Sequence, residues 1–190
     1  RICSIIKIFK IRIFSIMLRN SLFILSLLFV SCDSEGPVSS ENTPANYNYS
    51  LEDLNPTSTS YQEYIETSNF SNKVTIHYFG HYSWGTCSAR FEQLNDLYES
   101  LLSDGYTQVN LIGIGKDSHI SFLSNWVDSN NAPVCADTSP FSTWSDWNAS
   151  QRDLFILDHS GEMVFQQNIS SGIPNDLEST IINLINQIPN

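Results

Sequence analysis

The chain has 190 residues, and 20 acidic residues against nine Lys and Arg give it a formal net charge of −11 at pH 7. Such a balance repels nucleic acid phosphates and anionic lipid headgroups, which excludes a nucleic acid partner and purely electrostatic membrane binding. The sequence has no P-loop and no dinucleotide fingerprint, and its four histidines lack the spacing of a zinc site, so we expect no cofactor and no metal.

Residues 17–32 have the organisation of an export signal, and residues 1–16 are interpreted as an upstream extension. Met17 and Arg19 precede an apolar stretch, Leu22 to Val30, which is too short for a comfortable membrane span. The following FVSC segment resembles the lipobox of bacterial lipoproteins, whose cysteine carries lipid and becomes the new N-terminus; this cysteine is Cys32. The alternative is an ordinary signal with an incidental cysteine. We assign residues 1–32 to an upstream extension plus lipoprotein signal, which predicts a lipid anchor in the bacterial cell envelope.

A polar tether is predicted to follow this signal. Residues 33–50 are rich in Ser, Asn, Glu and Pro and have few aliphatic side chains, which is typical of a flexible linker. Only four of the nine Lys and Arg follow Cys32, whereas all 20 acidic residues do, so the remainder carries a formal charge of −16. Residues 51–190 are enough for one domain with its own core.

The domain begins with a turn-rich entry segment, Leu51 to Asn72, and then alternates strands with helices. Val74 to Phe79 predicts a buried strand, about Thr86 to Ser103 an amphipathic helix, and Val109 to Ile114 a second strand. Because a helix separates the two strands, we expect them to be parallel.

The second half predicts two more helices and a hairpin. A helix capped by Ser118, with Ile120, Leu123, Trp126 and Val127 as its apolar positions, precedes an edge strand at Pro133 to Ala136. A loop or short helix follows at Thr138 to Gln151, held by Trp144 and Trp147. Leu154 to Leu157 and Glu162 to Gln167 predict a hairpin. The last expected element is a helix from Pro174 or Asn175, whose apolar face consists of Leu177, Ile181, Leu184, Ile185 and Ile188. This order predicts an α/β sandwich with a mixed central sheet.

The residue with the clearest chemical signal is Cys87, where the first strand and its loop meet the first helix. A thiol in the first helical turn lies among unpaired N–H groups at the positive end of the helix dipole. That position favours the thiolate, which attacks disulfides and peroxides. The alternative is that Cys87 is a small buried apolar residue, as many free cysteines are.

The order of elements, with a cysteine where the first helix begins, resembles the thioredoxin-like fold of redoxin type. YFGHYSWGTCSARF has the look of its active-site segment, and RDLFILDHSGEMVF resembles its later strand, turn and strand. More specifically, these pieces with GYTQVNLIGIG and APVCADT resemble the N-terminal domain of selenoprotein P and its bacterial relatives. The resemblance implies a three-layer thioredoxin-like sandwich, thiol-disulfide or peroxide chemistry, and thiol or disulfide protein partners.

Two positions depart from the family pattern. The first position of the CxxC pair is Trp84, so a local dithiol cannot form, and only the second position, Cys87, is kept. Thioredoxins also place a cis-proline before the strand that corresponds to Leu154–Leu157, and Arg152 stands there instead.

Three explanations of Trp84 remain open from the sequence. The protein has lost dithiol chemistry, or Cys135 replaces the missing partner of Cys87 in an oxidising compartment, or position 84 is a selenocysteine whose UGA codon was read as tryptophan. His81 flanks the site and is a weaker candidate for proton transfer to Cys87, whereas Asp158 is expected to be a hairpin-turn residue.

The sequence therefore predicts an envelope-anchored thioredoxin-like redox lipoprotein with a degenerate WxxC site that retains Cys87. The alternative is a non-catalytic binding or structural module on the same scaffold. We expect an exposed, acidic Cys87 to favour the enzyme and a fully buried Cys87 to favour the module.

Overall fold

A computed structural model describes residues 47–189. Cys32 and the rest of the predicted export signal lie outside these residues. The described elements are β1 Ser50–Glu52, β2 Tyr64–Glu66, η1 Thr67–Phe70, β3 Val74–Phe79, α2 Gly85–Ser103, β4 Val109–Lys116, η2 Asp117–Phe122, α3 Ser124–Val127, β5 Val134–Asp137, α4 Ser142–Asp146, β6 Asp153–Leu157, β7 Met163–Asn168 and α5 Leu177–Ile185.

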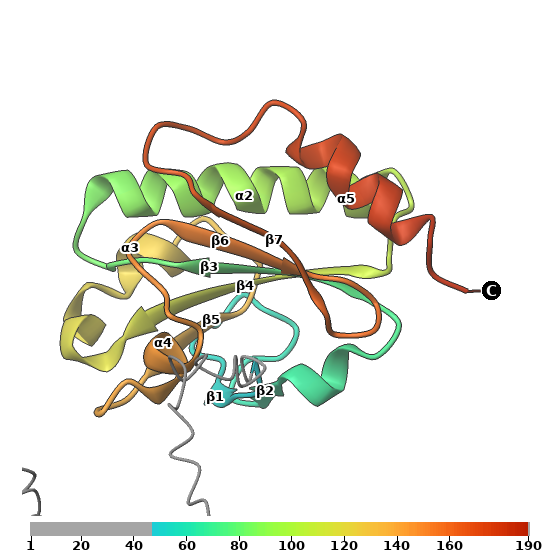
Figure 1. The fold of residues 1–190 in the computed structure, drawn as a ribbon. Helices are drawn as coiled ribbons and strands as arrows, with labels where there is room; N and C mark the ends of the chain where they lie inside the picture. Colours follow the sequence, from blue (N-terminus) through green and yellow to red (C-terminus); the bar gives the residue numbers. More distant parts are fainter. Residues whose placement is uncertain (1–46, 190) are drawn as a thin grey trace, which may run out of the picture. The chain divides into compact units, whose positions relative to one another are not determined.

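The centre of the domain is a five-stranded sheet in the order β5-β4-β3-β6-β7. β3 is parallel to β4, and β4 to β5, because each connection carries helical turns back across the sheet. β6 and β7 form the predicted hairpin and run antiparallel to β3 and to each other. α2 and α5 cover one face of the sheet, and α4 with the β1–β2 pair covers the other (Figure 1). The predicted three-layer α/β sandwich with a mixed sheet is confirmed.

β3 is buried along its whole length, which is expected for a central strand covered on both faces. Its side chains alternate between two cores. The core on the α2 side takes Val74, Ile76 and Tyr78, whereas the core on the α4 side takes Phe79. The predicted anchors Trp144 and Trp147 pack in this second core.

The predicted helix from Ser118 is wrong in its first half. Lys116, not Ser118, precedes the first helical turn, and the 3-10 segment η2 is kinked at His119. Only the short α3 contributes buried side chains, those of Trp126 and Val127. Ile120 is 43% exposed, so the apolar periodicity that suggested one long helix did not mark a buried face.

The entry segment also has more structure than the predicted turns. β1 and β2 pair antiparallel, and Asp53 bridges Cys135 at the edge strand β5. Tyr49 is buried and Ser50 begins β1, so the packed domain begins before the predicted boundary at residue 51. In the described part of the chain, no helix has both the length and the apolar character needed to cross a membrane.

His77 makes the stability of the domain depend on pH. Its ring is fully buried on β3, hydrogen-bonded to the Tyr49 hydroxyl at 3.0 Å, and burial lowers its pKa to about 3. The unfolded chain binds a proton at His77 below about pH 6.5, whereas the folded chain does not until about pH 3. Stability contributed by neutral His77 is therefore lost as the pH falls through this window, by about 1.4 kcal/mol per unit.

Urea unfolding at pH 7 and pH 5 checks this prediction. Between pH 7 and pH 5, the unchanged chain should lose about 2 kcal/mol of its free energy of unfolding through His77. We expect the His77→Phe protein not to show this loss. His159→Gln, in the half-buried hairpin turn, is the control and should keep the full loss. An unchanged acid loss in His77→Phe would contradict the assignment.

Candidate functional site

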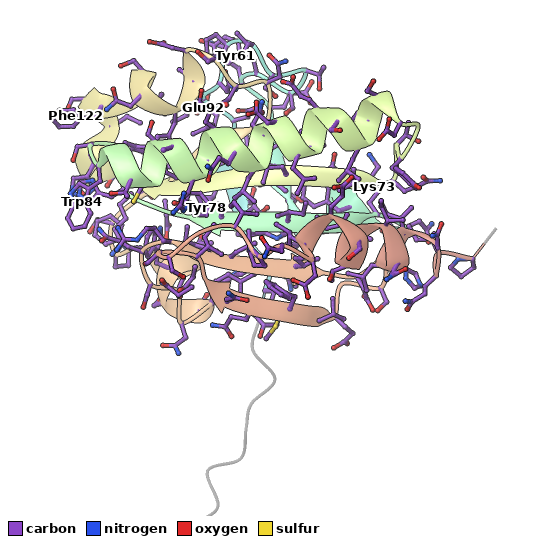
Figure 2. All side chains as sticks on the ribbon, turned by 90° about the horizontal axis from the view of Figure 1, so that it is seen from above. Tyr61, Lys73, Tyr78, Trp84, Glu92 and Phe122 are labelled. Carbon is purple, nitrogen blue, oxygen red and sulfur yellow. The ribbon has the colours of Figure 1, made fainter. Side chains whose placement is uncertain are left out.

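The loop after β3 leads directly into α2 at Trp84. Gly80 begins this loop, and a Cβ there would lie 2.7 Å from the Trp126 ring, so glycine is needed for the close packing. Trp84 is the N-cap of α2, and its carbonyl oxygen accepts from the backbone N–H groups of Cys87 at 2.8 Å and Ser88 at 3.1 Å. Its side chain is 45% exposed at the N-terminal end of α2 (Figure 2). Position 84 is therefore open to solvent.

Cys87 lies in the first turn of α2, at the predicted junction of strand, loop and helix. Its side chain has no exposed surface and packs in the core on the α2 side. Its carbonyl oxygen accepts from the Tyr78 hydroxyl at 3.2 Å. The first helical turn thus pairs an exposed position 84 with a buried thiol at position 87.

Tyr78 supplies a neutral hydroxyl to this site. Burial, followed by the neighbouring Cys87, raises the pKa of Tyr78 well above its usual value, although Arg152 and Arg90 act in the opposite direction. The Tyr78 ring packs against the rings of Trp126 and Phe91, with centroids 5.4 and 6.2 Å away, and those two rings also stack on each other at 4.8 Å. Because the hydroxyl remains protonated, Tyr78 can donate a hydrogen bond but cannot serve as a base.

Arg152 brings a positive charge between positions 84 and 87. Its Nη1 lies 4.0 Å from the Cys87 Sγ, and its guanidinium carbon lies 5.8 Å from the centre of the Trp84 ring. Its backbone has φ +69° and its N–H donates to the Phe79 carbonyl at 2.7 Å. The cis peptide bond of the described chain is at Ser139-Pro140, after β5, so Arg152 does occupy a site without the expected cis-proline.

From the sequence, Arg152 is notable only as the residue that stands in place of the cis-proline. The signal that could have found it is the hairpin, because an antiparallel strand beside β3 must start at the end where β3 finishes. Asp153 is in fact the partner of Phe79, so Arg152 falls just beyond that end, beside the loop.

His81 lies beside Trp84, and the hydrogen bond of its ring goes to Ser83. Its ring stacks on Trp84 at 5.2 Å, its Nδ1 is hydrogen-bonded to the Ser83 hydroxyl at 3.0 Å, and its centroid is 3.4 Å from that of His119. Partial burial, then His119 and Lys116, lower the pKa of His81. His81 and His119 line a cavity of about 110 Å³ together with Lys116 and Trp144. Within residues 47–189, no cluster of three or more His, Cys, Asp or Glu could hold a metal ion.

Cys135 is not a partner for Cys87, and that prediction is corrected. Both thiols are free, and the two side chains belong to cores on opposite faces of the sheet. The Cys135 Sγ faces the Leu51 carbonyl at 3.9 Å, and burial, followed by Asp53, raises the pKa of this thiol well above its usual value. Cys135 is therefore an inert core residue.

Asp158, as predicted, is a turn residue: one of its carboxylate oxygens accepts from the backbone N–H groups of Ser160 and Glu162.

The arrangement fits a two-position exchange site. Residues three apart in a first helical turn have Cα atoms about 5 Å apart, within the range of a disulfide. The exposed position would attack a substrate and the buried one would resolve the mixed disulfide. In this chain, the exposed position carries Trp84 and only the buried position carries sulfur.

Comparisons with known proteins agree with this architecture. No family model and no curated protein matches the sequence. A thiol:disulfide interchange protein from Chlorobium tepidum superposes with a TM-score of 0.57 at 13% identity, covering 73% of this chain and 93% of that one. A secreted disulfide oxidoreductase of Mycobacterium tuberculosis, described as homologous to E. coli DsbE, gives 0.53 at 13% identity and covers 74% and 96%.

The thioredoxin domain of a thiol-disulfide oxidoreductase from Bacteroides vulgatus gives a TM-score of 0.55 at 12% identity and covers 74% of this chain and 94% of that one. At these identities the likeness concerns the fold. The closer resemblance to the selenoprotein P N-terminal domain stays a prediction. The chain has the thioredoxin-like fold.

Proposed function

We propose that this chain is a thioredoxin-like redox protein of the cell envelope, with position 84 as the attacking position and Cys87 as the retained resolving thiol. The observation that carries the proposal is the first turn of α2, where position 84 is exposed, Cys87 is buried one turn later, and Arg152 lies against both. Solved proteins of the same fold are thiol-disulfide oxidoreductases, which supports thiol or disulfide proteins as partners.

Tryptophan at position 84 closes this site to dithiol exchange. A large apolar ring stands where the attacking sulfur or selenium belongs, and Cys87 has no exposed surface to meet a disulfide or peroxide directly. A chain that carries Trp84 is therefore expected to have a sluggish thiol and negligible exchange activity.

The codon at position 84 tests the proposal before any enzymology. A UGA codon beside a selenocysteine insertion element would place selenium at the attacking position, and mass spectrometry of the native protein would find it. A UGG codon together with an inert Cys87 would contradict the redox function and favour a binding module without catalysis.

That second candidate is a binding module without catalysis. It is favoured by the full burial of Cys87 and by apolar side chains exposed near the same end of α2, namely Trp84 at 45% and Phe122 at 48% (Figure 2). Substituting Trp84 would then weaken binding of a protein partner and leave exchange activity absent in every variant.

Anchoring through lipid on Cys32 is part of the proposal. A thioredoxin-fold relative in Mycobacterium tuberculosis is described as secreted, which is compatible with export of this chain. We expect Cys32→Ser to move the protein from the membrane fraction to the soluble envelope fraction, because the acidic remainder cannot bind anionic lipid by itself. Fractionation and immunoblotting of both forms checks this. Membrane association that survives Cys32→Ser would rule out the anchor.

A further inference from the structure

We propose that Arg152 stabilises the thiolate of Cys87 and thereby enables this buried cysteine to act as the resolving nucleophile. The role in turnover rests on the proposed redox function, whereas the effect on thiolate formation can be measured without it. Arg152 would be a positioning residue, because its guanidinium acts through the Cys87 sulfur.

A fully buried thiol requires such a partner. Removal from water disfavours the charged form of any thiol, so a buried thiolate needs a positive charge or hydrogen-bond donors beside it. The start of α2 offers some compensation through its N–H groups, and the Nη1 of Arg152 adds a full positive charge at 4.0 Å from the Sγ. Tyr78, the other polar side chain at this sulfur, remains neutral.

The charge of Arg152 is also not used elsewhere. In the described part of the chain, its side-chain hydrogen bonds go to Ser170 and Cys87, and neither is a carboxylate. The adjacent carboxylate of Asp153 is occupied, since its two oxygens accept from the Ser150 N–H and the Asn168 side-chain amide, each at 2.7 Å. The guanidinium charge is therefore directed at the thiol and the Trp84 ring.

The backbone holds Arg152 in this orientation. Its φ of +69° is uncommon for a residue with a side chain. Two backbone hydrogen bonds hold this conformation: the Arg152 N–H donates to the Phe79 carbonyl, and the Arg152 carbonyl oxygen accepts from the Ile169 N–H at 2.8 Å. The Nε donates to the Ser170 hydroxyl at 2.7 Å, which anchors one edge of the guanidinium and leaves the other toward Cys87. A strained backbone conformation that aims a charge at a thiol is the combination expected at a functional position.

The step that Arg152 would assist is the second half of thiol-disulfide exchange. A thiolate or selenolate at position 84 first attacks one sulfur of a substrate disulfide. The substrate S–S bond breaks, its other sulfur leaves as a thiolate, and a mixed disulfide or selenenylsulfide remains at position 84. The Cys87 thiolate then attacks the atom at position 84, the bond from that atom to the substrate sulfur breaks, and the substrate leaves with the electron pair and takes up the proton that Cys87 lost. Two electrons pass from the protein pair to the substrate disulfide.

The test is a titration of thiolate absorbance in a Cys135→Ser background, where Cys87 is the remaining thiol of the described domain. We expect Arg152→Met to lower the thiolate fraction at a given pH about tenfold, which moves the absorbance curve about one pH unit higher. Arg152→Lys should restore part of the shift. The control is Lys73→Met, which removes the same charge at the opposite end of α2 from Trp84 and should leave the curve in place (Figure 2). If Arg152→Met does not fold by circular dichroism, Arg152→Gln is titrated instead.

A second readout separates this inference from the proposed function. In a Trp84→Cys background, Arg152→Met should move upward the pH profile for release of substrate from a preformed mixed disulfide at position 84, because Cys87 performs that step. A folded Arg152 variant with an unmoved absorbance curve would overturn the inference. Absent exchange in Trp84→Cys, with the absorbance shift intact, would instead overturn the redox function and leave the effect of Arg152 on the thiol standing.

Discussion

Trp84→Cys is expected to reduce insulin disulfides, with a dithiol donor, about a hundredfold faster than the unchanged chain. The substitution puts sulfur at the exposed N-cap of α2, where the helix dipole and the Arg152 guanidinium favour its thiolate. Cys87 lies one turn away to resolve the mixed disulfide. Turbidity of precipitating insulin chains measures the gain.

Two control variants decide what causes the gain. Trp84→Ser opens the loop without adding sulfur and should stay at the level of the unchanged chain. Trp84→Cys combined with Cys87→Ala keeps the attacking sulfur without the resolving one, so it should form mixed disulfides but turn over poorly. A Trp84→Cys protein that is no faster than Trp84→Ser would show that the first turn of α2 is not an exchange site.

Gly115→Ala is expected to destabilise the domain by about 3 kcal/mol. A Cβ at Gly115, on β4, would lie 2.2 Å from the Cζ and 2.6 Å from the Cε1 of the Tyr82 ring. The ring cannot easily move away, because it is fully buried, its hydroxyl donates to the Cys135 carbonyl at 2.6 Å, and it packs edge-on against Trp126. Tyr82 belongs to the loop before Trp84, so the substitution should disturb the site as well.

Urea unfolding at pH 7 measures this effect, and Gly85→Ala is the matched control. A Cβ at Gly85, the first residue of α2, meets no atom within 4 Å, so alanine should leave stability unchanged or raise it by up to about 1 kcal/mol. Equal stabilities of Gly115→Ala and the unchanged chain would mean that Tyr82 is not packed as described.

Local patterns in the sequence predicted most of the elements that position the site. The apolar run from Val74 to Phe79 is β3 to the residue, and the spacing of apolar residues after Thr86 marked α2 through Ser103. The hairpin turn at Asp158 also lies where its turn residues indicated. These features are set by interactions between near neighbours, and they were enough to place Cys87 at the start of a helix.

Features that depend on strand register could not be predicted. Cys135 is the partner of Ile114 on β4, and this pairing turns its thiol toward the core opposite Cys87. A shift of one residue would have turned it the other way, and a single sequence gives no information on the register. For Arg152, the hairpin indicates the correct end of β3, but its contact with Cys87 depends on the exact pairing of Asp153 with Phe79.

Disulfide mapping of oxidised Trp84→Cys protein tests most directly whether positions 84 and 87 form an exchange site. The unreduced protein is digested and its cross-linked peptides are identified by mass spectrometry. We expect a disulfide between the introduced cysteine and Cys87, with Cys135 recovered as a free thiol. Recovery of all three thiols unlinked, or a disulfide that contains Cys135, would contradict it.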